Sequence, residues 1–134
     1  MVVDSTALPE QVVDDVITSA FRSAGQRCSA LRVLFVQSDV ADGIIELLAG
    51  AMKELVVGDP HKLSTDVGPV IDQAAHDRIS AHLMHLKETA TFIAKSPSAD
   101  PKLNGYFVEP QAWEISSLSA LHEEVFGPIL HIVR

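Results

Sequence analysis

The chain places a helix with one apolar face directly before a segment that is apolar on both faces. Pro9 suits a first helical turn, and Gly25 is where the helical period stops. Between them, apolar side chains recur at helical spacing at Val12, Val13, Val16, Ile17, Ala20, Phe21 and Ala24. Residues 31–37 then form an apolar run, which is typical of a central strand covered on both faces of its sheet. Such a strand needs helices on both sides, so this segment favours an α/β fold.

The same alternation continues along the chain. Ser38 or Asp39 can begin a second helix, and Asp72 can cap a third. The expected inward residues are Val40, Ile44, Leu47, Leu48, Ala51, Met52 and Leu55 in the second helix, and Ala75, Ile79, Leu83 and Leu86 in the third. Short apolar runs predict strands at residues 2–3, 91–94, 106–108, 112–115 and 129–133. We therefore predict one α/β layered domain with a mostly parallel sheet flanked by helices.

The connections are less regular. Residues 57–69 predict a long surface connection, and residues 96–101 predict a loop. Residues 116–122 are ambiguous and are compatible with a single helical turn. Because proline has no amide hydrogen, Pro110 is expected to place the strand around it at a sheet edge or a bend.

Composition excludes several classes of protein. The chain has 134 residues, 47% of them apolar, and a formal net charge of −8, which argues against nucleic-acid or anionic-lipid partners. No apolar run approaches the roughly 20 residues needed to cross a bilayer, and the first residues lack a cationic start. One cysteine cannot form an internal disulfide. We expect a cytoplasmic protein with no membrane insertion.

Cys28 is the candidate nucleophile. It follows Gly25 and Gln26 in a predicted tight turn, and a thiolate at the edge of a sheet can attack a carbonyl carbon. Arg27 and Arg32 lie within a few residues and would favour the thiolate form. The alternative is that Cys28 is a small buried apolar residue.

The histidines do not predict a metal site. His82 and His85 have a spacing at which two helical side chains can share a metal, but no cysteine or carboxylate cluster completes the set. We expect the histidines to be solvated and no metal to bind. The sequence also lacks a glycine-rich phosphate-binding loop.

Two motifs carry a resemblance to a known family. Residues 21–28 read Phe-x-x-x-Gly-Gln-x-Cys, and residues 123–128 read Glu-Glu-x-Phe-Gly-Pro. Both resemble the aldehyde dehydrogenase superfamily, in the same order along the chain. Arg-Cys-Ser-Ala-Leu-Arg at residues 27–32 is similar to the branch that oxidises L-glutamate 5-semialdehyde in proline catabolism. Softer matches at residues 58–60, 66–71 and 105–110 extend the resemblance over the whole chain.

The resemblance implies specific roles. Cys28 would form a thiohemiacetal and then a thioester with the aldehyde, and Ser29 would bind the substrate carboxylate, although a purely structural role for Ser29 is an equal alternative. Glu124 would bind the ribose hydroxyls of NAD, and Phe126 would lie beside the nicotinamide. In a bifunctional proline-catabolic member, FAD would serve only the separate proline dehydrogenase half. The parent enzyme would be a homo-oligomer.

The resemblance also implies missing parts. The family's general-base Glu, its oxyanion-hole Asn and its cofactor-binding domain would precede Met1. The chain begins on one predicted strand and stops directly after another. We therefore expect residues 1–134 to be a partial catalytic domain from a longer protein, inactive alone. Two alternatives remain open, a cysteine-dependent hydrolase or acyl transferase and a non-catalytic α/β interaction module.

Overall fold

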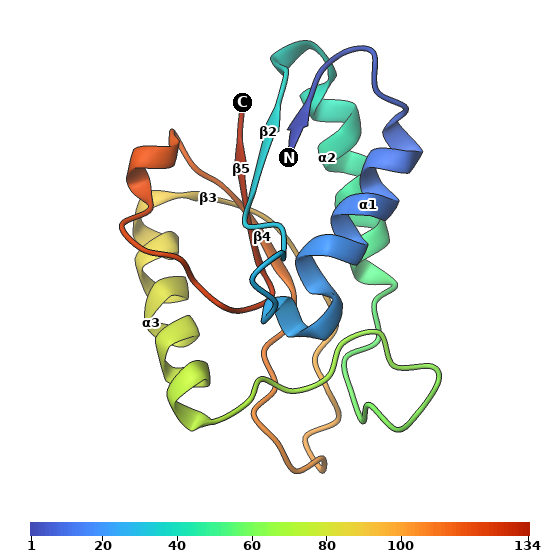
Figure 1. Ribbon diagram of the computed structural model, residues 1–134, viewed down its shortest axis with the longest axis vertical. Coiled ribbons are helices and arrows are strands. Elements are labelled where there is room, and N and C mark those ends of the chain that lie inside the picture. The colour runs from blue at the N-terminus through green and yellow to red at the C-terminus, as the bar shows by residue number, and fades with distance from the viewer.

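The computed structural model describes all of residues 1–134, which form a single five-stranded mixed sheet with helices on both faces (Figure 1). The helices are α1 (Pro9–Phe21), α2 (Ser38–Lys53) and α3 (Gln73–Thr89). The strands are β1 (Val2–Val3), β2 (Val33–Val36), β3 (Thr91–Lys95), β4 (Gln111–Glu114) and β5 (Ile129–Val133). Two short 3-10 turns, η1 (Arg22–Gly25) and η2 (Leu118–Ala120), complete the chain.

The sheet has the order β1-β2-β5-β4-β3. Three of its pairings are parallel, and only β3 and β4 run antiparallel. The predicted α/β fold with a mostly parallel sheet is therefore confirmed. In the middle of the sheet, every residue of β5 is buried, as a strand covered on both faces should be.

Helices α1 and α2 lie on one side of the sheet, and α3 lies on the other (Figure 1). The buried side of α2 consists of Ala41, Ile44, Ile45, Leu48 and Met52. The expected inward position of Leu47 was wrong, since this residue is 45% exposed. The fully buried residues Ala41, Leu48 and Met52 mark the centre of the apolar face of α2, and Leu47 lies about 100° around the helix from Leu48. No helix is long and apolar enough to span a membrane.

Asp72 caps α3 as the sequence predicts. Its side-chain Oδ1 accepts a hydrogen bond of 2.7 Å from the amide of Ala75. This bond satisfies one of the amide groups that have no partner within the first helical turn. Ala75, Ile79 and Leu86 are buried beneath the helix.

The strand predicted at residues 106–108 was wrong, and so was the first of the two alternatives for Pro110, a sheet edge. Residues 106–108 make only one isolated bridge, between Tyr106 and Val70, because Gly105 turns the backbone with φ of +146° just before them. Pro110 does not place its strand at an edge, since β4 lies between β5 and β3. The proline precedes the first residue of β4, and the ladder begins with the Gln111 amide donating to Pro128 O at 2.9 Å.

The prediction of solvated histidines was also wrong for two of them. His131 on β5 is 2% exposed, and its Nε2 lies 2.8 Å from Nε2 of His82 on α3. His131 Nδ1 lies 2.9 Å from the carbonyl oxygen of Arg32. Because a carbonyl oxygen only accepts, His131 Nδ1 must carry its hydrogen, and His82 Nε2–H donates to His131 Nε2. Both rings are neutral in this arrangement.

The histidine pair makes stability depend on pH. Burial, together with the charges of His131 and His85, lowers the pKa of His82 to about 4, and burial lowers the pKa of His131 as well. An unfolded chain binds protons near the ordinary histidine pKa of about 6.5. Between about pH 6.5 and 4 the unfolded state therefore binds more protons, and the folded state loses stability as the pH falls.

We expect the free energy of unfolding, measured by urea denaturation, to decrease as the pH falls from 7 to 4.5. His82→Gln can still donate to His131 but cannot titrate, so it should reduce this dependence on pH. His122→Gln, an exposed histidine outside the pair, is the matched control and should leave it unchanged. Equal pH dependence in both variants would contradict the role of the pair.

Candidate active site

The two predicted functional segments meet at one edge of the sheet. Residues 26–32 precede β2, and residues 121–128 precede β5. Strands β2 and β5 are parallel neighbours, with Val33 opposite His131. Their amino ends therefore lie side by side, and the two loops that lead into them are brought together. A fold of this topology places Cys28 and Glu124 on the same edge although their residue numbers differ by 96.

The loops approach each other through two glycines. Gly25 has φ of +62°, and a Cβ placed on it would lie 2.1 Å from the carbonyl oxygen of Gly127. Ser23 and Ala24 also have positive φ, of 57° and 51°. Helix α1 consequently ends at Phe21 and not at Gly25, because these left-handed residues cannot continue it. This turn allows the backbone before Cys28 to contact the backbone before β5.

Gln26 fixes the far side of the same turn. Its Oε1 accepts a 2.8 Å hydrogen bond from the amide of Ile71, and its Nε2 donates to Ser23 O at 3.1 Å. The side chain thus joins the turn to the long connection between α2 and α3. Both the amide oxygen and the amide nitrogen of Gln26 are therefore engaged in holding the shape of the loop.

Cys28 and Ser29 lie on the exposed tip of this loop. Cys28 forms no hydrogen bond with any histidine, and its thiol lines neither of the two cavities that Glu124 lines. His82 and His131 are committed to each other. The structure therefore brings no base of the cysteine-hydrolase type to the thiol, and the thiol is open to an external electrophile.

Arg32 joins the two loops. Its Nε donates to Glu124 Oε1 at 3.2 Å, and its two terminal nitrogens donate to Gly25 O at 2.5 Å and to Arg27 O at 3.0 Å. The guanidinium carbon also lies 4.7 Å from the centre of the Phe126 ring. The sequence suggested only that Arg32 adds positive charge near Cys28, whereas the structure pairs it with Glu124.

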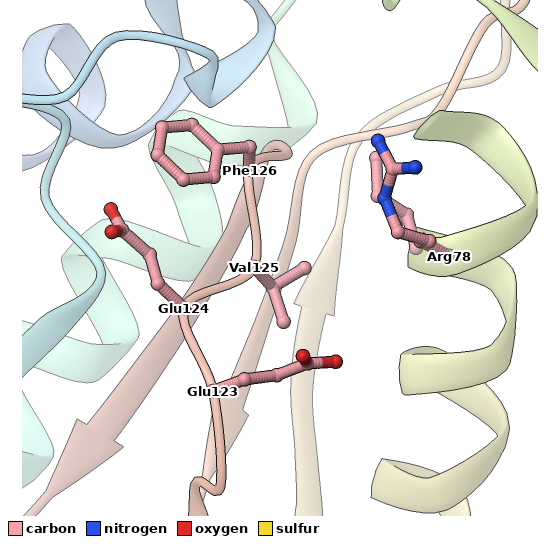
Figure 2. Close-up of a pocket in the computed structure, with 6 residues that line it drawn as sticks. Arg78, Glu123, Glu124, Val125 and Phe126 are labelled. Carbon is pink, nitrogen blue, oxygen red and sulfur yellow. The ribbon is translucent and has the colours of Figure 1, made fainter. Parts of the chain in front are cut away.

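Glu124 and Phe126 face the Cys28 loop. Figure 2 shows their side chains on one side of the 123–126 segment, while Glu123 and Val125 point the other way, toward Arg78 on α3. A cavity of about 290 Å³ separates this segment from α3. A second cavity, of about 260 Å³, is lined by Arg32, Glu124 and His131 among others.

These side chains fit the nicotinamide riboside of NAD. The Glu124 side chain is 49% exposed, and a carboxylate with one oxygen held by Arg32 can still accept hydrogen bonds from vicinal hydroxyls at the other. Phe126 is 44% exposed and offers an apolar ring beside it. For a metal ion there is no comparable set, since no three histidine, cysteine or acidic side chains converge.

The close contact at Gly25 makes a sharp prediction. Gly25→Ala should lower the free energy of unfolding by about 2–4 kcal/mol, because the added methyl group overlaps Gly127 O and the backbone is left-handed. The matched control is Gly43→Ala in α2, where a Cβ would meet nothing within 4 Å and should stabilise by about 0.5–1 kcal/mol. Urea denaturation measures both, and a similar small effect in the two variants would exclude the contact.

The exposure of Cys28 is tested by alkylation. Iodoacetamide should modify the native chain within about tenfold of its rate in guanidinium chloride, since an exposed thiol needs no unfolding. Peptide mass spectrometry should place the label at residue 28, and Cys28→Ala should remain unlabelled. Modification only after denaturation would mean that the thiol is buried.

Comparison with known proteins finds relatives that match the whole chain. The bifunctional protein PutA of Klebsiella aerogenes is 49% identical over 139 residues, covering 100% of this chain and 11% of the relative. A 1-pyrroline-5-carboxylate dehydrogenase from Geobacillus is 33% identical over 136 residues, covering 100% of this chain and 26% of the relative. The chain thus spans about a tenth of the first relative and a quarter of the second.

The fold has solved counterparts. A crystal structure of a point mutant of Bradyrhizobium japonicum proline utilization A (PutA) matches with a TM-score of 0.91 and 55% sequence identity, covering 99% of this chain and 14% of that one. The sequence model of the aldehyde dehydrogenase family matches residues 1–134, the whole length of the chain. The chain belongs to the aldehyde dehydrogenase family.

Proposed function

We propose that this chain is the thiol-bearing part of the catalytic domain of an NAD-dependent dehydrogenase that oxidises L-glutamate 5-semialdehyde to glutamate. One observation supports this most directly. An exposed cysteine and an exposed carboxylate–phenylalanine pair occupy adjacent loops at one edge of the sheet, joined through Arg32. The names of the relatives PutA and 1-pyrroline-5-carboxylate dehydrogenase support the choice of substrate.

The chemistry begins at Cys28. Its thiolate attacks the aldehyde carbon, a C–S bond forms, and the carbonyl oxygen becomes the oxyanion of a thiohemiacetal. The backbone N–H of Cys28 lies in the exposed turn and can donate to that oxyanion. Glu124 and Phe126 would hold NAD, which would supply the acceptor for the hydride that leaves this carbon. The carbon is thereby oxidised to a thioester on Cys28, which water then cleaves to release the acid and the thiol.

The other residues bind and orient. Glu124 accepts hydrogen bonds from the ribose hydroxyls, and Phe126 packs beside the nicotinamide. The Ser29 hydroxyl, exposed next to the thiol, binds the substrate carboxylate. The base that activates water, the Asn that completes the oxyanion hole and the dinucleotide-binding domain belong to other parts of the parent enzyme. FAD has no role in this segment.

The same proposal includes a cellular compartment and an oligomeric state. The free thiol that the reaction requires fits a reducing cytoplasm, because oxidation would remove the nucleophile. The parent enzyme is a homo-oligomer in this proposal, as the family resemblance implies.

A segment exchange tests the function. Replacing the matching segment of Escherichia coli PutA, which is 50% identical to this chain, with residues 1–134 should preserve NADH formation from L-glutamate 5-semialdehyde. Cys28→Ala in the exchanged protein should lower kcat by at least about 10³-fold, since the covalent route is lost. Ser119→Ala, a serine outside the candidate site, is the matched control and should retain activity.

The 134-residue chain alone should produce no NADH. Turnover by the isolated chain would contradict the partition of catalytic groups proposed here. An exchanged protein that folds and stays active after Cys28→Ala would contradict the role of the thiol. Cleavage of esters by the isolated chain, dependent on Cys28 and a histidine, would favour the hydrolase alternative.

A further inference from the structure

Arg32 lies just before β2 with a mostly buried side chain, and its guanidinium contacts three parts of the site at once. The acceptors are the carboxylate of Glu124, the carbonyl of Gly25 and the carbonyl of Arg27. Its side chain is 14% exposed, compared with 49% for Glu124. Arg32 is therefore the buried partner, and Glu124 is the partner that faces solvent.

An isolated ion pair with so exposed a carboxylate contributes little to stability. The contacts of Arg32 instead constrain geometry, because the guanidinium has a fixed planar shape. Its nitrogens lie in one rigid plane, so satisfying three acceptors fixes their relative positions. The same plane lies against Phe126, and this contact restricts the ring as well.

The backbone of Arg32 is fixed too. Its carbonyl oxygen accepts from the backbone amide of His131 at 2.9 Å and faces Nδ1 of the same residue at 2.9 Å. His131 is itself held by His82 on α3, the helix that packs against that face of the sheet. The guanidinium therefore extends from a residue whose main chain is bound to the buried central strand.

We propose that Arg32 is a positioning residue, which holds the Glu124 carboxylate and the Phe126 ring at a fixed place relative to the Cys28 loop. This inference rests on the proposed function, because it assigns Arg32 the task of aligning the cofactor-contacting side chains with the nucleophile. Holding one carboxylate oxygen leaves the other available to ribose hydroxyls and reduces the conformational freedom lost on binding.

Hydrogen exchange followed by mass spectrometry tests the positioning. Arg32→Met removes all three donors, and amide exchange in residues 25–29 and 123–127 should rise about tenfold relative to α2. Arg32→Lys keeps the charge but offers one ammonium group to three separated acceptors, so it should rescue exchange only in part. Arg22→Met is the control. It removes the same charge at an exposed position, the first residue of η1.

The pattern of hydrogen exchange in these variants decides whether Arg32 positions the two loops. Increased exchange in both segments for Arg32→Met, with none for Arg22→Met, supports the proposal. An increase that is equal in α2 shows global destabilisation and overturns it, as does an increase confined to one of the two loops. Glu124→Gln gives an internal check, because it should loosen residues 123–127 while the Arg32 contacts to Gly25 and Arg27 persist.

A second readout separates this inference from the proposed function. Nicotinamide mononucleotide carries the ribose and ring that Glu124 and Phe126 would contact, and it should slow exchange in residues 123–127 of the wild-type chain. Arg32→Met should lose this protection. If the wild-type chain shows none, the cofactor role of Glu124 fails, whereas the comparison of variants still decides whether Arg32 holds the two loops together. Equal protection in wild type and Arg32→Met would overturn the positioning role.

Discussion

The contact between the backbones at Gly25 and Gly127 is the constraint on which the site depends. It requires a left-handed turn after α1 and leaves no room for a side chain at Gly25. Because β2 and β5 are parallel neighbours, the two turns are already at one edge, and the glycines let them touch. Without this approach the Arg32 side chain could not contact Glu124 and Gly25 together.

Several further contacts depend on the one between Gly25 and Gly127. The buried strand β5 carries His131, which holds the carbonyl of Arg32, and the Arg32 side chain then joins Glu124 to the loop before Cys28. Stability and chemistry are thus divided between two regions. The buried contacts lie in the core, and the exposed thiol of Cys28 and carboxylate of Glu124 lie at its surface.

Local patterns in the sequence predicted the elements and the chemistry-bearing residues. The apolar periods gave α1, α2 and α3, and two short motifs singled out Cys28, Glu124 and Phe126, whose roles remain proposals. The pairing of Arg32 with Glu124 and of His82 with His131 could not be predicted, because these partners are 92 and 49 positions apart. A polar residue within an apolar strand, as at His131, was the available indication. The topology did not point to this place either, since ligand sites in open parallel sheets usually lie at the carboxyl ends of strands, whereas the proposed site lies at the amino ends.

The most direct measurement uses the single thiol. A nitroxide attached to Cys28 should broaden the amide NMR resonances of residues 124–126 strongly, because both loops lie at the amino ends of β2 and β5. Resonances of residues 38–41, at the carboxyl end of β2, should be broadened much less (Figure 1). Strong broadening at residues 38–41 with sharp resonances at residues 124–126 would place the thiol at the wrong edge of the sheet and contradict a shared active site.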